Sequence, residues 1–172
     1  MNLEVLNCIK ERRSVRDYKP MQIKDYELNA VLEAGIYAPT GRGSQAVRLV
    51  VVQDKETREL LSRMNAEILG SETDPFYGAP TFVIVFTDKE RSTYVEDGTL
   101  AIGNMMLAAY AVGLGSCWIH RAREVFSTSV GKELMKRWGV PENYVGIGHC
   151  VLGYAVGRAK PTPRKVKNII RV

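Results

Sequence analysis

Cysteine is scarce in this sequence, and its spacing is irregular. The three cysteines, Cys8, Cys117 and Cys150, form no Cys-x-x-Cys pair and are too few for a disulfide framework. The first 13 residues mix Glu4, Lys10 and Glu11 among apolar ones, so they lack the uncharged core of a secretory signal. We therefore expect a cytoplasmic, reducing location.

Histidine is rarer still, with only His120 and His149 in 172 residues. Two isolated histidines provide neither a metal-ligand cluster of recognisable spacing nor a Ser-His-Asp arrangement. His149 and Cys150 stand in an apolar run, and Cys117 in another, so all three are expected in the core. A metal centre and a protein nucleophile are both disfavoured.

Charge is absent from residues 98–119, a stretch nominally long enough to span a bilayer. Glycines at positions 113 and 115 divide it into a helical part and a short strand-like part. We therefore expect a buried helix followed by a strand, and no membrane partner.

The positive net charge of +5 belongs to the end of the chain. Six bases follow Glu142, the last acid, and without them the 24 basic residues become 18, against 19 acidic ones. These six are Arg158, Lys160, Arg164, Lys165, Lys167 and Arg171. The distribution favours a local anion site over a broad nucleic-acid face, and a nucleic-acid-binding domain that uses the basic tail is only the third hypothesis.

Apolar spacing predicts five helices and four strands. The helices are expected near 2–12, 24–38, 55–69, 93–112 and 131–138, and the strands near 49–52, 82–86, 116–120 and 144–156. The β-branched runs 49–52 and 82–86 are both predicted to be central strands, buried on two faces. The small residues of 93–112 predict close packing on another helix, of this chain or of a partner subunit.

No repeat or linker divides the chain, so a single domain over residues 1–172 is expected, with 157–172 as an extended basic tail. The element order predicts an α+β or α/β sandwich. It does not predict the order of the strands.

The segment Arg12-Arg13-Ser14-Val15-Arg16 follows the first predicted helix. In an extended chain Ser14 and Arg16 project to the same side, and Arg12 precedes them by one turn-like step. Guanidinium and hydroxyl donors suit the ionised oxygens of a phosphate. The alternative is a solvated helix end, where basic side chains favour the helix dipole.

Three further segments attract attention: 38–45 (APTGRGSQ), 113–120 (GLGSCWIH) and 161–165 (PTPRK). Glycines in the first allow close backbone approach, and its hydroxyl and amide side chains suit the edge of a planar heterocycle. Taken separately, they are also explained as a helix-ending loop, a capped helix before a buried strand, and a polar terminus.

Taken in order, the four segments resemble the nitroreductase-like family of FMN-dependent oxidoreductases, over about residues 9–165. The resemblance implies a three-layer α+β sandwich with a mixed, mainly antiparallel central sheet flanked by helices. It implies a homodimer formed through long helices, with each flavin in a groove shared by both subunits and the tail embracing the partner. Gly43 and Ala46-Val47 depart from the Asn and Pro-Trp of the family loop.

The resemblance also implies the residues that hold the FMN. Expected at the phosphate and ribityl chain are Arg12, Arg13, Ser14 and Arg16, and expected beside the ring are Pro39, Thr40, Gly41, Arg42 and Gln45. Backbone groups near the ring would come from Trp118, Ile119 and His120, and the tail would return Arg164 and Lys165 to the phosphate.

The implied activity is a ping-pong cycle in which flavin N5 takes hydride from NAD(P)H and then reduces a nitroaromatic, a quinone or a similar small acceptor. The catalytic chemistry is then carried by the flavin. The alternative is a non-catalytic flavin-binding or flavin-storage protein on the same fold. The acceptor and the preference between NADH and NADPH are left open.

Overall fold

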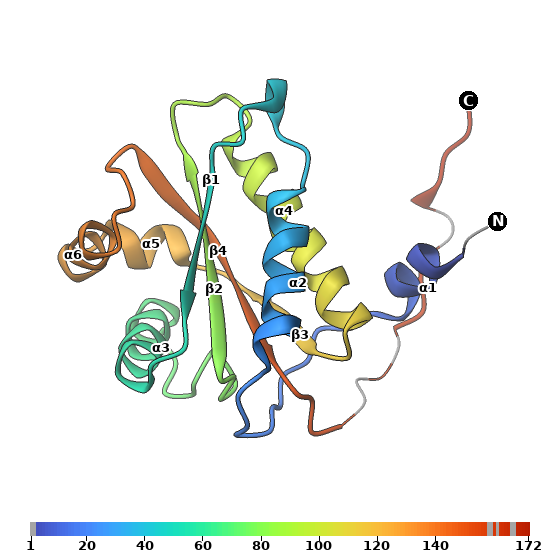
Figure 1. Ribbon diagram of the computed structural model, residues 1–172, viewed down its shortest axis with the longest axis horizontal. Helices are drawn as coiled ribbons and strands as arrows, with labels where there is room; N and C mark the ends of the chain where they lie inside the picture. Colours follow the sequence, from blue (N-terminus) through green and yellow to red (C-terminus); the bar gives the residue numbers. More distant parts are fainter. Residues whose placement is uncertain (1–2, 158–159, 161, 166–167) are drawn as a thin grey trace.

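The centre of the fold is a four-stranded sheet with helices on both faces (Figure 1). The computed structural model describes residues 3–157, 160, 162–165 and 168–172. The strands are β1 (Val47–Val52), β2 (Thr81–Asp88), β3 (Gly115–Ile119) and β4 (Tyr144–Gly153). The helices are α1 (Glu4–Glu11), α2 (Asp25–Ile36), the 3₁₀ turn η1 (Gly41–Gly43), α3 (Lys55–Leu69), α4 (Tyr94–Ala111), α5 (Ala122–Ser127) and α6 (Ser129–Arg137).

The strand order is β1-β2-β4-β3, and every ladder between these strands is antiparallel. Ile84 of β2 is opposite Val50 of β1 on one side and His149 of β4 on the other. The extended chain after α1 adds a parallel bridge from Ser14 to Ser116. The sheet is therefore mainly antiparallel with one parallel pairing among the described residues, and this confirms the expected fold class.

One expectation about the sheet is wrong. Residues 49–52 were predicted to form a central strand, but β1 is an edge strand with β2 as its single neighbour. Val50 and Val52 belong to one core and Leu49 and Val51 to the other, so the run is apolar because helices cover both faces. An apolar run indicates that both faces of a strand are covered, but it does not indicate whether the strand has a neighbouring strand at each of its edges.

The two faces of the sheet carry separate cores. Helices α3, α5 and α6 cover one face, where the aromatic rings of Phe76, Phe82 and Phe126 lie. Helices α2 and α4 cover the other. Gly98 lets α4 approach the sheet, because a Cβ there would meet Ile147 Cγ1 at 2.6 Å. The small-residue helix thus packs on both α2 and the sheet.

The helices agree with the sequence in place and differ at their ends. Helix α2 ends at Ile36 rather than near residue 38, α6 begins at Ser129 rather than near 131, and α5 was not predicted. Asn2, where the first helix was expected to begin, lies outside the described residues, and Leu3 occupies the cap position of α1 without a side-chain hydrogen bond.

Helix α1 contributes no buried residue, although its apolar side chains share one face. Leu6 and Ile9 are about half exposed. In the part of the tail that the structure describes, no α-helix or strand is assigned. Among the described helices, none combines the length and the apolar composition needed to cross a membrane.

Candidate functional site

The segment after α1 is fixed against strand β3. Val15 N–H donates to Ser116 O at 2.9 Å, and the Ser14–Ser116 bridge continues this pairing. Gly115 permits the contact, since a Cβ there would lie 2.9 Å from Val15 Cγ2. Val15 therefore packs against the edge of the sheet, on the same core as Cys117 and Tyr77.

Arg13 has a different position from the other two arginines. Its Nη1 donates to Lys10 O at 2.6 Å and to Arg12 O at 2.7 Å, so the guanidinium closes the carboxyl end of α1. It also leaves Nε buried without a partner. Arg13 therefore holds the end of the helix while keeping one donor free.

A cavity of about 460 Å³ lies where this segment, β3 and the beginning of the tail meet. Its lining includes Arg12, Arg13 and Ser116, with Ala155 and Gly157 from the chain that leads into the tail. Glu11 also lines it, whereas Ser14 and Arg16 do not. Three buried polar atoms of these residues have no hydrogen-bond partner: Arg12 Nη1, Arg13 Nε and Ser116 Oγ. Buried donors without partners are costly, so this cavity suits a ligand with several anionic acceptors.

The pKa of Cys117 depends on charged and polar groups of the segment after α1. Burial raises the pKa of the Cys117 thiol, while Arg16, the hydroxyl of Ser14 and Arg12 act in the opposite direction. Arg12, Ser14 and Arg16 therefore converge on the same stretch of β3. Arg16 also lies over the Tyr77 ring, with its guanidinium carbon 6.0 Å from the ring centroid.

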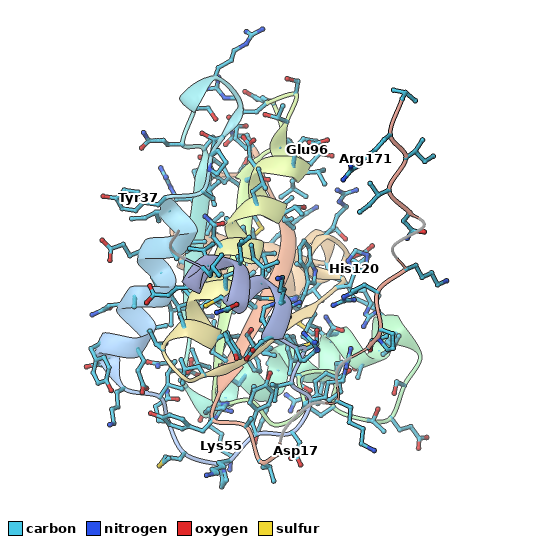
Figure 2. All side chains as sticks on the ribbon, turned by 90° about the vertical axis from the view of Figure 1, so that its right-hand side faces the viewer. Asp17, Tyr37, Lys55, Glu96, His120 and Arg171 are labelled. Atoms are coloured by element: carbon cyan, nitrogen blue, oxygen red, sulfur yellow. The ribbon has the colours of Figure 1, made fainter. Side chains whose placement is uncertain are left out.

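The corner between β3 and α5 is held from two sides. Asn65 of α3 is fully buried, and its Nδ2 donates to His120 O at 2.9 Å. Its Oδ1 accepts from Arg121 Nε at 3.0 Å. From β4, Nδ1 of the buried His149 lies 3.2 Å from Ile119 O. His120 itself is exposed, on the side of the molecule that carries α1 and the C-terminal segment (Figure 2).

Trp118 faces away from the arginines. A Cβ on Gly148 would meet its indole nitrogen at 2.7 Å, and the ring packs on the core beneath α2 and α4. Of the three residues expected near a ring, Trp118 can therefore offer backbone groups only.

The loop at 39–45 is tied to the first turn of α4. Gly41 N–H donates to Oδ1 of the buried Asp97 at 2.9 Å, and Gln45 N–H donates to Thr40 Oγ1 at 3.0 Å. Arg42 and Gln45 have φ values of 55° and 50°, and the side chains of both are exposed, as is that of Pro39. The loop thus presents polar side chains outward from a restrained backbone.

One chain does not bring this loop to the arginines. The loop contacts Asp97, near the beginning of α4, whereas Glu11 accepts a hydrogen bond from the hydroxyl of Tyr110, near its end. Thirteen helical residues separate the two contacts, which is about 20 Å at 1.5 Å per residue. Figure 1 shows the loop and α1 beside opposite ends of α4.

Arg164 and Lys165 are exposed in the structure. The beginning of the tail lines the cavity, but these two side chains do not. Their assignment to a phosphate stays a prediction. Arg158 and Lys167 lie outside the described residues.

Comparison with known proteins places this geometry in a family. The model of the nitroreductase family matches residues 9–154. The chain belongs to the nitroreductase family. A nitroreductase from Bacteroides fragilis, solved with bound FMN, has 35% identity and a TM-score of 0.91, and each chain is covered completely. A second FMN-bound nitroreductase, from Desulfitobacterium hafniense, has 30% identity and a TM-score of 0.90, again over both whole chains.

A protein of Archaeoglobus fulgidus assigned to the NADH dehydrogenase/NAD(P)H nitroreductases is 32% identical over 156 residues. The match covers 88% of this chain and 85% of that protein.

Within this nitroreductase-family chain, sequence reasoning missed Asn65, Arg121 and Ser116. Asn65 occupies an inward position of α3, and a polar side chain on an apolar helix face was the available signal. Ser116 stands beside the predicted strand residue Cys117, so its burial was foreseeable while its lack of a partner was not. Arg121 gave no local signal, since a φ of +73° is expected of glycine rather than arginine.

Proposed function

We propose that this protein binds FMN and passes hydride from NAD(P)H to a small oxidised acceptor, such as a nitroaromatic or a quinone, in the cytoplasm. The observation that carries the proposal is the cavity at the Ser14–Ser116 bridge, with its three unpartnered buried donors. The FMN-bound relatives support the choice of the ligand.

The residues present fit the phosphate end of FMN. Arg12 and Arg13 supply guanidinium donors in the cavity and Ser116 a hydroxyl. Ser14 and Arg16, which act on the neighbouring Cys117, are proposed to reach the phosphate from beside the cavity. A phosphate dianion would satisfy donors that the folded chain leaves without partners, and charge-assisted hydrogen bonds are among the strong ones. The tail's Arg164 and Lys165 are proposed to add charge to the same group.

The ring end of the flavin is proposed to lie toward the carboxyl end of β3. Ile119 is three residues beyond Ser116, which is about 10 Å along a strand. There Asn65 contacts the backbone carbonyl of His120, and His149 contacts that of Ile119. Fixed backbone dipoles of this kind stabilise charge without reorganisation.

Bound FMN supplies the two-electron chemistry, accepting and returning hydride in separate half-reactions. For a quinone the overall balance is NAD(P)H plus a proton plus quinone, giving NAD(P)⁺ and hydroquinone. For a nitroaromatic it is NAD(P)H plus a proton plus the nitro compound, giving NAD(P)⁺, the nitroso compound and water. This chain then needs only to bind, orient and shield the reactants, which agrees with the buried positions of Cys117 and His149.

A homodimer completes the proposed site. Because α4 separates the 39–45 loop from the arginines, the loop of one subunit would meet the flavin of its partner. Apolar side chains stand exposed on the elements that would face the partner: Val95 and Leu100 of α4, Leu6 and Ile9 of α1, and Ile36 and Tyr37 at the end of α2. Tyr37 projects outward in Figure 2. Exposed apolar groups gathered in this way are typical of an interface.

The proposal is tested by purifying the protein and recording its visible spectrum before and after NADH or NADPH is added without oxygen. We expect the flavin bands, bleaching by at least one donor, and recovery of the bands when a quinone is added. Colourless protein that does not take up added FMN would refute the proposal. Bound flavin that neither donor reduces would favour the storage protein instead.

The phosphate assignment is tested with Arg12→Ala, and with Lys55→Ala as its control. Lys55 is exposed and contacts Glu59 at 3.8 Å, far from the cavity in sequence and structure. Loss of charge-assisted bonds of about 1.5–3 kcal/mol should weaken FMN binding by at least tenfold in Arg12→Ala only. Equal retention of FMN by the two variants would show that Arg12 does not hold the phosphate.

A further inference from the structure

We propose that Arg121 gives this protein a preference for acceptors that carry a carboxylate, so that its substrates are small anionic oxidised rings. The inference rests on the proposed function and goes further by naming the substrate class. It concerns a residue that no motif in the sequence indicated.

The guanidinium of Arg121 is oriented by a buried side chain. Its Nε donates to Asn65 Oδ1 at 3.0 Å, and the same amide donates through Nδ2 to His120 O at 2.9 Å. Asn65 is fully buried, so its position is set by the packing of α3. The fork of the guanidinium is thus held at one edge, with the Nη groups left for another partner.

The backbone of Arg121 is strained, which indicates a cost that the side chain helps to offset. Its φ is +73°, in the left-handed region that costs a non-glycine residue about 1–2 kcal/mol. A glycine would adopt this conformation without that cost but would leave Asn65 Oδ1 buried without its donor. Strain of this kind concentrates at binding and catalytic sites.

No acidic partner for Arg121 exists in the part of the chain that the structure describes. The two ion pairs found there, Lys55–Glu59 and Arg91–Asp88, are on other elements. The groups around Arg121 are the neutral Asn65, the buried His149, the exposed His120 and Arg123, whose guanidinium lies over the Tyr94 ring. Glu124, in the first turn of α5, is exposed and forms no ion pair with Arg121 in the described part of the chain, so Arg121 is a cation fixed in place without a carboxylate partner.

The position of this cation matches the ring end of the proposed flavin site. Arg121 follows β3 directly, beyond the strand residues whose backbone is proposed to lie at the ring. An acceptor that reaches the flavin there comes within range of the free Nη groups. A carboxylate on that acceptor can receive two parallel hydrogen bonds from a guanidinium.

The experiment compares 4-nitrobenzoate with 4-nitrobenzamide, which has the same shape and no charge, in the FMN-loaded protein. The quantity is the ratio of their kcat/KM values in the natural protein, in Arg121→Gly and in Arg63→Ala. Glycine suits the backbone at position 121, so the variant keeps the left-handed conformation there and removes only the side chain, including its hydrogen bond to Asn65 Oδ1. Arg63 is exposed, and its position two residues before Asn65 places it on the opposite side of α3, so Arg63→Ala removes an equal charge elsewhere.

We expect Arg121→Gly to lower the carboxylate-to-amide ratio about tenfold, as the loss of one charge-assisted hydrogen bond does. Arg63→Ala should leave the ratio within about twofold. A second readout does not depend on turnover: binding of the non-reducible 4-aminobenzoate to the oxidised holoprotein, followed by the flavin spectrum, should weaken by a similar factor in Arg121→Gly.

Three results would overturn the inference. One is an unchanged ratio in Arg121→Gly, and another is an equal fall in Arg63→Ala. The third is an effect confined to flavin reduction by NAD(P)H, which would mean that Arg121 binds the donor's phosphates. Activity toward both acceptors without any preference would refute the role of Arg121 alone, whereas absence of bound FMN would refute the proposed function itself.

Discussion

Replacing His149 by leucine should change how stability depends on pH, because His149 is a fully buried histidine with little to stabilise its charged form. Burial lowers the pKa of His149 to about 4 from an ordinary value of 6.5, and Arg121 acts in the same direction. Its ring lies edge-on to Phe76, with centroids 5.0 Å apart, and Nε2 has no partner. The folded protein therefore holds the neutral form.

The direction of the effect follows from the pH at which the folded and the unfolded state each take up the proton. Below pH 6.5 the unfolded chain protonates His149 while the folded chain does not, so unfolding is favoured as the pH falls toward about 4. The stability contributed by keeping His149 neutral is fully present above pH 6.5. Each pH unit within this window is worth about 1.4 kcal/mol, so the change from about pH 7.5 to about pH 5 is about 2 kcal/mol.

The assay is urea unfolding of both proteins at these two pH values, with the same concentration of free FMN throughout, because ligand binding itself adds stability. The natural protein should lose about 2 kcal/mol more than His149→Leu between them. Carboxylates such as Glu27, whose hydrogen bond from Tyr154 lowers its pKa, are present in both proteins and cancel in the comparison. Equal losses in the two proteins would mean that His149 is not held neutral by burial.

Two further changes test the packing and the assembly. In Gly115→Ala the new Cβ would lie 2.9 Å from Val15 Cγ2, so Val15 should be displaced. The melting temperature and FMN retention should both fall, with a stability loss of about 1–3 kcal/mol. Unchanged values would mean that the segment after α1 adapts to the added methyl group. Leu100→Lys should convert the proposed dimer to a monomer in sedimentation and weaken FMN binding, whereas Val130→Lys, a change at an equally exposed residue of α6, should do neither. A natural protein that already sediments as a monomer would contradict the proposed shared site.

Much of the fold follows from the sequence, since apolar spacing identified each described strand and each described α-helix except α5. Six residues give α5 too few turns for a period to stand out, so it was missed. The edge position of β1 was missed for a different reason. Val50 and Leu49 face different cores, and that pattern is the same for an edge strand and a central one.

The site was predictable in part for similar reasons. The sequence indicated Arg12, Ser14 and Arg16 as one group, and in the structure all three act on the pKa of Cys117, although only Arg12 lines the cavity. It could not indicate that α4 separates them from Thr40 and Gln45, since distance in space depends on the packing of the whole chain. Nor could it indicate Arg121, whose role depends on a backbone conformation and on a contact across 56 residues.

The central claim is that the buried donors after α1 hold a phosphate. The most direct test is to titrate flavin-free protein with FMN and with riboflavin, which has the same ring and lacks the phosphate. Two or more charge-assisted hydrogen bonds predict that FMN binds at least about 100-fold more tightly. Equal affinity for the two flavins would contradict the account.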